Sequence, residues 1–172
     1  MNTRASTRPV PRDFASEAAK AKEAITILIV DDDEDCRLLF RDAIRQSKVC
    51  HRVFEVADGN QALDFLHRRG QWSHAPRPAL IFLDIEMPGM NGQEVLKAIK
   101  AAPNLRDIPI VMITGLSDES QMRKAAEAGA NSYTIKPARA EQFFKTVLAS
   151  TNYWLTIHQY PGHHLPPEQC RR

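Results

Sequence analysis

One stretch decides the fold: Ala79-Leu80-Ile81-Phe82-Leu83-Asp84-Ile85-Glu86-Met87-Pro88-Gly89-Met90-Asn91-Gly92. Its apolar run without polar alternation is typical of a strand covered on both faces, as in a parallel sheet flanked by helices. Asp84 then lies at the carboxyl edge of a central strand, where open α/β sheets place their chemistry. Pro88 and Gly89 predict a turn directly afterwards, and Asn91 is the expected N-cap of the next helix.

Outward from this stretch, short apolar runs alternate with longer segments of helical period from Ile25 onward. This alternation is typical of βα units in a parallel sheet. The expected strands are Ile25–Val30, Arg52–Val56, Ala79–Leu83, Pro109–Ile113 and Asn131–Ile135. Because right-handed crossovers place helices on both faces, five units predict an α/β fold with a doubly wound, five-stranded parallel sheet of flavodoxin-like order.

Length and composition limit what surrounds this sheet. The chain has 172 residues, of which 43% are hydrophobic, enough for one domain with tails. We expect a disordered N-terminal leader at 1–24, the sheet domain at 25–150 and a C-terminal extension or arm at 151–172. No apolar segment is long enough to span a membrane or resembles a signal peptide, so a cytoplasmic protein is expected. The net charge of +2 does not suggest nucleic-acid binding.

Complementary side chains follow four of the expected strands. Asp31 and Asp32 follow the first, Asp84 ends the third, Thr114 the fourth and Lys136 the fifth. Carboxylates brought together repel one another and require a cation, and an all-oxygen set with room for water favours Mg²⁺. A lysine and a hydroxyl beside that ion can stabilise phosphoryl oxygens during transfer. Asp84 is therefore the candidate nucleophile, which would become an aspartyl phosphate.

Each of these residues also has an ordinary structural explanation. A strand-end Asp often caps a helix, Thr114 can do the same, and Lys136 can be a surface lysine. Their joint placement favours a phosphoacceptor site. The competing hypotheses are a phosphatase of the haloacid dehalogenase type, which would want an Asp where Glu86 stands, and an interaction module without phosphotransfer.

Four motifs resemble the receiver domains of two-component response regulators: Val30-Asp31-Asp32, Leu83-Asp84-Ile85-Glu86-Met87-Pro88, Ile113-Thr114 and Tyr133-Thr134-Ile135-Lys136-Pro137. The resemblance implies a non-enzymatic switch in which a histidine kinase phosphorylates Asp84. It implies that Asp31, Asp32, Asp84 and the backbone carbonyl of Glu86 bind Mg²⁺. It also implies that Thr114 and Lys136 contact the phosphoryl group, that Tyr133 responds to Thr114, and that the Lys136–Pro137 bond is cis.

Two further segments resemble more narrowly the single-domain regulators that serve phytochrome photoreceptor kinases. One is the long link with Trp72, which we expect to cover the second helix. The other contains Tyr153, Trp154 and Leu155, where apolar and polar residues alternate as in an extended strand. We favour an arm that forms a homodimer over an arm that folds back onto its own sheet.

Overall fold

The computed structural model describes residues 25–47, 51–115 and 118–157. The expected leader at 1–24 and the end of the expected arm, 158–172, lie outside them. The strands are β1 (Ile25–Val30), β2 (His51–Val56), β3 (Leu80–Asp84), β4 (Ile110–Thr114) and β5 (Ser132–Ile135). The helices are α2 (Glu34–Arg45), α3 (Gly59–Leu66), η1 (Gly70–Trp72), α4 (Gly92–Ala101), α5 (Glu119–Glu127), α6 (Ala140–Asn152) and η2 (Tyr153–Ile157).

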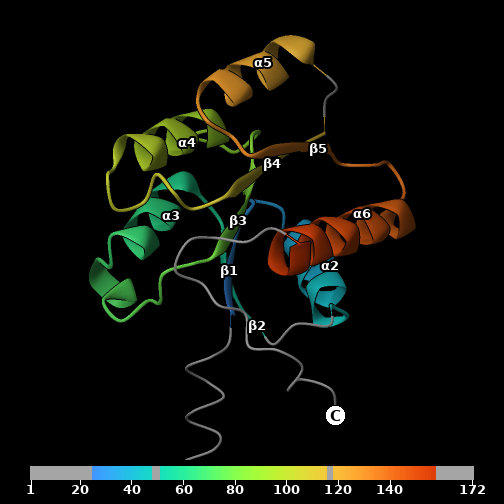
Figure 1. Ribbon diagram of the computed structural model, residues 1–172, viewed down its shortest axis with the longest axis horizontal. Helices are drawn as coiled ribbons and strands as arrows, with labels where there is room; N and C mark the ends of the chain where they lie inside the picture. Colours follow the sequence, from blue (N-terminus) through green and yellow to red (C-terminus); the bar gives the residue numbers. More distant parts are fainter. Residues whose placement is uncertain (1–24, 48–50, 116–117, 158–172) are drawn as a thin grey trace, which may run out of the picture.

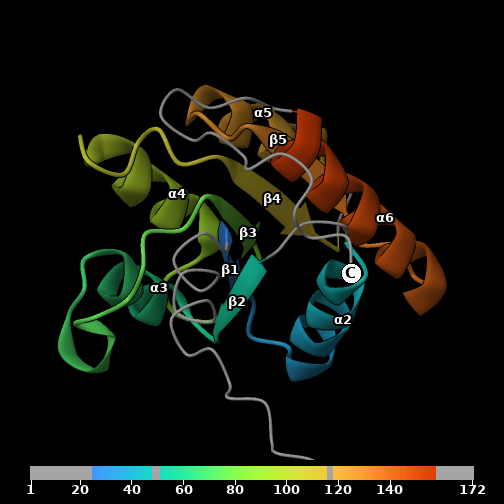
Figure 2. The same ribbon diagram turned by 60° about the horizontal axis from the view of Figure 1, so that its bottom comes forward.

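The five strands form one parallel sheet in the order β2-β1-β3-β4-β5, as the alternation of segments predicted. Figure 1 shows α2 and α6 on one side of this sheet and α3 and α4 on the other. Figure 2 shows the same layers from a second direction. Residue Ala125 of α5 joins the core on the α3 and α4 side. The doubly wound fold class is confirmed.

The central strands are buried on both faces. Leu28 of β1 packs into the core beneath α3 and α4, whereas its neighbours Ile27 and Ile29 pack into the core beneath α2 and α6. All three side chains have no exposed surface. Each such burial contributes on the order of 2 kcal/mol relative to an exposed side chain. This double burial fixes the strand ends that carry the candidate site.

The loop after β3 is shaped by its turn residues. Asn91 and Glu94 form a complete capping box at the start of α4. Gly89 adopts a positive φ of 75°, which glycine reaches without steric cost. Gly92 lies so close to the strand that an added Cβ would stand 2.0 Å from the backbone oxygen of Asp84. The turn therefore packs directly against the candidate nucleophile.

The C-terminal segment differs from the expected extended arm. Helix α6 runs past residue 150 and continues as the π-helical turn η2, so the strand prediction for this segment is wrong. Trp154 and Leu155 are buried in the core formed with α2 and the sheet, whereas Tyr153 is exposed. They continue the apolar face begun by Phe143 and Val147, because their spacing is helical.

Two smaller expectations have opposite outcomes. Trp72 of η1 packs edge-on against Phe65 of α3, with ring centroids 5.1 Å apart, as the predicted cover of that helix. The described residues contain no cis peptide bond, so the expected cis isomer of Lys136–Pro137 is wrong. The trans isomer is the intrinsically favoured one. No helix within the described ranges is both long and apolar enough to cross a bilayer.

Candidate phosphoacceptor site

The sheet register brings the four polar strand ends to one edge. Val30 of β1 pairs with Leu83 of β3, so the residues after both strands emerge side by side. Asp84 pairs with Ile113 of β4, one residue before Thr114. Thr114 in turn pairs with Ile135, directly before Lys136. The parallel pairing of the strands therefore brings the aspartate carboxylates, the Thr114 hydroxyl and the Lys136 ammonium to the carboxyl edge of the sheet.

Asp31 is held at every polar group. Its N–H donates to the carbonyl of Val56 at 3.2 Å, and its carbonyl accepts from Nη1 of Arg37 at 2.6 Å. Its Oδ1 accepts from the N–H of Asp33 at 2.9 Å, and its Oδ2 from Nζ of Lys136 at 2.8 Å. Burial raises the pKa of Asp31, and Lys136 opposes that rise. These hydrogen bonds hold both the backbone and the carboxylate of Asp31 in one position.

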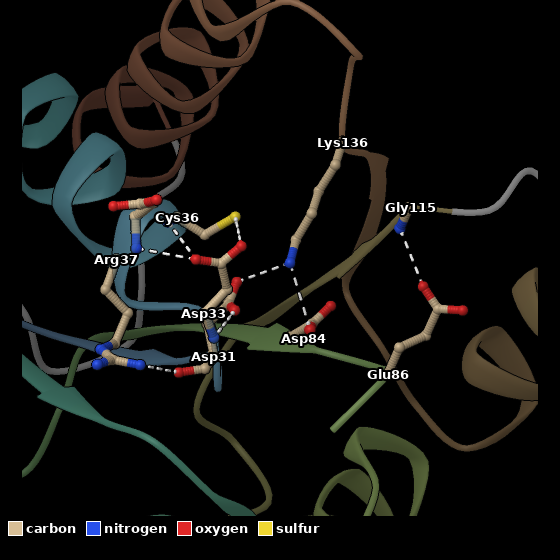
Figure 3. A network of polar contacts seen from close by, with 9 residues as sticks. Asp31, Asp33, Cys36, Arg37, Asp84, Glu86, Gly115 and Lys136 are labelled. Carbon is tan, nitrogen blue, oxygen red and sulfur yellow. Dashed lines mark hydrogen bonds and ion pairs between the residues drawn. The ribbon is translucent and has the colours of Figure 1, made fainter. Parts of the chain in front are cut away.

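Lys136 bridges the two buried carboxylates (Figure 3). Its Nζ also lies 3.3 Å from Oδ2 of Asp84. Burial alone would lower the pKa of Lys136, but its hydrogen bond to Asp31 and the charges of both carboxylates raise it. The ammonium stays charged at neutral pH and compensates part of the negative charge.

Asp84 is left only partly compensated. Its side chain is 4% exposed, and its Oδ1 has no hydrogen-bond partner within the described part of the chain. Burial raises the pKa of Asp84 to about 6, against the opposing charge of Lys136, while Asp31 and Asp32 push it further upward. A buried carboxylate oxygen without a partner is costly and calls for a further cation.

Three carboxylates offer such a cation a place. One oxygen each from Asp31, Asp32 and Asp84 lies within 4.8 Å of the others, and Asp32 is exposed to solvent. An all-oxygen set with an open side suits a hard divalent ion that keeps several waters, such as Mg²⁺. The residues present, including the unpartnered Oδ1 of Asp84, therefore fit the predicted metal site.

The opposite side of the site holds the two predicted switch residues. Thr114 is fully buried at the end of β4. Tyr133 of β5 is partly buried against the core beneath α3 and α4. Burial raises the pKa of Tyr133, and the nearby Thr114 hydroxyl counteracts this rise. The two residues are therefore neighbours, as a coupled pair requires.

The Glu86 side chain turns away from Asp84. Its Oε2 accepts the N–H of Gly115 at 3.3 Å, and Figure 3 shows the carboxylate directed toward that loop. A haloacid dehalogenase-type phosphatase needs an acid at this position beside the nucleophile. The geometry gives that alternative no support, and it leaves the backbone carbonyl of Glu86 as the predicted metal contact.

Sequence reasoning missed Arg37. This residue of α2 contacts the carbonyl of Asp31, and its Nε lies 3.9 Å from Oε2 of Glu55 on β2. An arginine in an amphipathic helix carries no signal of such a role, because both partners become neighbours only when β1, β2 and α2 pack together. Asp33, which the sequence presents only as one of an acidic run, is the N-cap of α2.

A five-stranded doubly wound sheet with this acidic edge, strand-end hydroxyl and bridging lysine defines the receiver class of signalling domains. The sequence matches the response regulator receiver domain over residues 27–148, and the chain belongs to this family. It is 33% identical over 136 residues to response regulator Rcp1 of Synechocystis sp., covering 79% of this chain and 92% of that protein.

Two solved structures show the same fold. The phosphorylated cyanobacterial phytochrome response regulator RcpA is 32% identical, with a TM-score of 0.78 over 81% of this chain and 99% of that one. The Mn²⁺-bound form of Rcp1 is 32% identical, with a TM-score of 0.77 over 80% of this chain and 99% of that one. The predicted similarity to phytochrome-associated regulators is confirmed.

Proposed function

We propose that this protein is a phosphorylation switch that accepts a phosphoryl group on Asp84. The observation that carries the proposal is the ammonium of Lys136 held between two buried carboxylates, with the exposed Asp32 completing a metal-sized cluster. Phosphorylated RcpA and Mn²⁺-bound Rcp1 support it as relatives. Asp31, Asp32 and Asp84 would hold Mg²⁺, together with the backbone carbonyl of Glu86.

The chemistry depends on the positions of the side chains. A carboxylate oxygen of Asp84 forms a bond to phosphorus as the phosphorus–nitrogen bond of a donor phosphohistidine breaks, and the imidazole leaves with its electron pair and takes up a proton. Asp31, Asp32 and Asp84 would hold a Mg²⁺ ion that would supply positive charge next to the phosphoryl oxygens. Lys136 shifts its donors from Asp84 to those oxygens, and the Thr114 hydroxyl donates to another.

The proposed donor is a histidine kinase, and the phytochrome-associated relatives point to a photoreceptor kinase of that type. The protein itself turns over no separate substrate, and it acts in the cytoplasm. Movement of Thr114 toward the phosphoryl group would draw Tyr133 inward and alter the surface around β5. This coupling is the step that converts chemistry into a signal.

Incubation with a small phosphodonor and intact-mass measurement tests the proposal. The wild type is expected to gain one phosphoryl group with Mg²⁺ and none with a chelator, and Asp84→Asn is expected to gain none in either condition. The adduct should be lost in base and retained in acid. Steady hydrolysis of many phosphate esters without an adduct would instead restore the phosphatase hypothesis.

Homodimer formation remains part of the proposal, with a smaller surface than the predicted arm. Trp154 and Leu155 are buried in their own core, whereas Tyr153 is 47% exposed at the end of α6 and Leu38 of α2 is 43% exposed. The test is the solution mass of the wild type with and without phosphorylation, compared with Tyr153→Arg. A mass that stays monomeric in both states of the wild type would remove dimerisation from the account.

A further inference from the structure

We propose that Arg37 is a positioning residue for the metal site and acts through the peptide group between Asp31 and Asp32. The inference rests on the proposed function of that site. Arg37 Nη1 donates to the carbonyl of Asp31 at 2.6 Å, the shortest contact made by that residue, and only 15% of the Arg37 side chain is exposed. Figure 3 shows its guanidinium directed toward Asp31.

The contact matters because Asp32 is the next residue in the chain. A peptide group is planar, so fixing the Asp31 carbonyl also fixes the direction in which the backbone enters Asp32. The carboxylate of Asp32 makes no hydrogen bond or ion pair with another described residue. Its position toward a metal ion therefore depends on the backbone that carries it. Arg37 holds that backbone through its hydrogen bond to the Asp31 carbonyl.

The guanidinium is itself held in place by β2. Glu55 lies 3.9 Å from Nε of Arg37 and accepts a hydrogen bond from Nη1 of Arg41 at 3.2 Å. Arg41 therefore satisfies the glutamate, and Arg37 keeps Nη1 for the Asp31 carbonyl. The planar fork of arginine can serve a carbonyl and a carboxylate at once, which a lysine ammonium does less well. Partners behind metal ligands of this kind commonly set metal affinity.

The two arginines give a matched pair of variants that distinguishes a positioning role from a purely electrostatic one. Arg37→Gln and Arg41→Gln each remove one positive charge from the same helix and the same glutamate. A purely electrostatic role predicts that either loss leaves cation binding unchanged or makes it tighter, because a nearby positive charge repels the ion. A positioning role predicts that Arg37→Gln weakens binding despite the lost repulsion.

The experiment titrates the folded full chain with Mn²⁺ alone, following the free-ion signal by electron paramagnetic resonance, and then displaces Mn²⁺ with Mg²⁺. Circular dichroism and urea unfolding confirm that each variant is folded. Arg37→Gln is expected to bind the metal about tenfold more weakly than the wild type. Arg41→Gln is expected to stay within about twofold of it. Arg37→Lys, which keeps the charge but loses the planar fork, should fold and bind the metal several-fold more weakly.

Phosphorylation rates at different Mg²⁺ concentrations then distinguish a loss of metal affinity from a loss of phosphoryl-transfer activity. Arg37→Gln should accept the phosphoryl group slowly at low Mg²⁺ and nearly as fast as the wild type at saturating Mg²⁺. Equal or tighter metal binding by folded Arg37→Gln and Arg37→Lys would overturn the inference while leaving the proposed function intact. Absence of metal binding by the wild type would overturn the proposed function, and the positioning role with it.

Discussion

The two halves of the sheet edge differ in how firmly they are packed. The acceptor half consists of β1, β3 and α2 and carries Asp31, Asp32 and Asp84. All five residues of β3 are buried. The response half consists of β5, α5 and the Thr114 end of β4, and no residue of β5 is buried. The proposed phosphoacceptor and metal ligands thus lie beside a fully buried strand, whereas Tyr133 and Lys136 belong to a strand and loop that keep some solvent exposure.

Lys136 joins the two halves. Its ion pairs to Asp31 and Asp84 run from the end of β5 to the ends of β1 and β3. A phosphoryl group on Asp84 would compete for this ammonium and for the Thr114 hydroxyl. The acceptor half has little freedom to respond, so the displacement is expected in the response half. Substitutions in the acceptor half should accordingly have larger effects than substitutions in the response half.

Trp154 ties η2 to the strands of the acceptor half. Its side chain is 7% exposed and lies in the core cluster that contains Ile29 and Phe82. Trp154→Ala is expected to lower the free energy of unfolding by about 4 kcal/mol, because it leaves a large cavity. Urea unfolding measures this loss. The exposed neighbour is the control: Tyr153→Ala should cost less than about 1 kcal/mol, and similar losses in both variants would contradict the buried turn.

The acceptor half and the response half differ in how much room each leaves for a side chain at a glycine. Gly92→Ala would push a Cβ against the Asp84 carbonyl at 2.0 Å, whereas the Cβ of Gly115→Ala would meet, among the residues that the structure describes, only the flexible Glu86 carboxylate at 3.4 Å. The first substitution is expected to cost about 3 kcal/mol of unfolding free energy and to slow phosphorylation, since the nucleophile must shift. The second should be within about 0.5 kcal/mol of the wild type. Equal unfolding free energies for Gly92→Ala and Gly115→Ala would mean that the loop between β3 and α4 is not rigid.

The pKa of Asp84 makes stability depend on pH. It is raised from 3.8 to about 6 by burial, so between these values the folded state binds more protons than the unfolded state. Unfolding free energy contributed by Asp84 must therefore fall as pH rises through this window, by up to about 3 kcal/mol. In a chelator, Asp84→Asn should match the wild type near pH 4 and exceed its stability at pH 7.5. A variant that is less stable at pH 7.5 would show that Asp84 is better compensated than its contacts indicate.

A small effect is expected on the edge strand β5. Ile135 of β5 is 41% exposed, so Ile135→Ala should change the free energy of unfolding by no more than about 1 kcal/mol. Thermal or urea unfolding is sufficient to measure it. A loss above about 2 kcal/mol would place Ile135 among the core residues and remove the contrast between the two halves.

Much of the fold and the site could be predicted, because the apolar runs identify the strands and the polar residues directly follow those runs. The apolar run before Asp84 identifies a doubly covered strand, and parallel strands necessarily end at the same edge. The polar residues at those ends could therefore be grouped without knowing any distance. The resemblance of the surrounding motifs to receiver domains assigned the same polar residues to one site.

The remaining features depend on packing that the sequence does not specify. Tyr153, Trp154 and Leu155 form too short a window to distinguish a strand from a helix by alternation. Their continuity with Phe143 and Val147 at helical spacing was the signal that favoured a helix. Arg37 could not be found at all, since its partner is a backbone carbonyl that has no sequence signature.

The most direct test of the central claim locates the phosphoryl group itself. The wild type is phosphorylated by a small donor or a phosphorylated histidine kinase in Mg²⁺, reduced with borohydride, digested and sequenced by tandem mass spectrometry. An aspartyl phosphate is converted to homoserine by this reduction, so homoserine is expected at Asp84 and not at Asp31 or Asp32. Homoserine at another aspartate, or at none in a protein that has gained a phosphoryl group, would contradict the account.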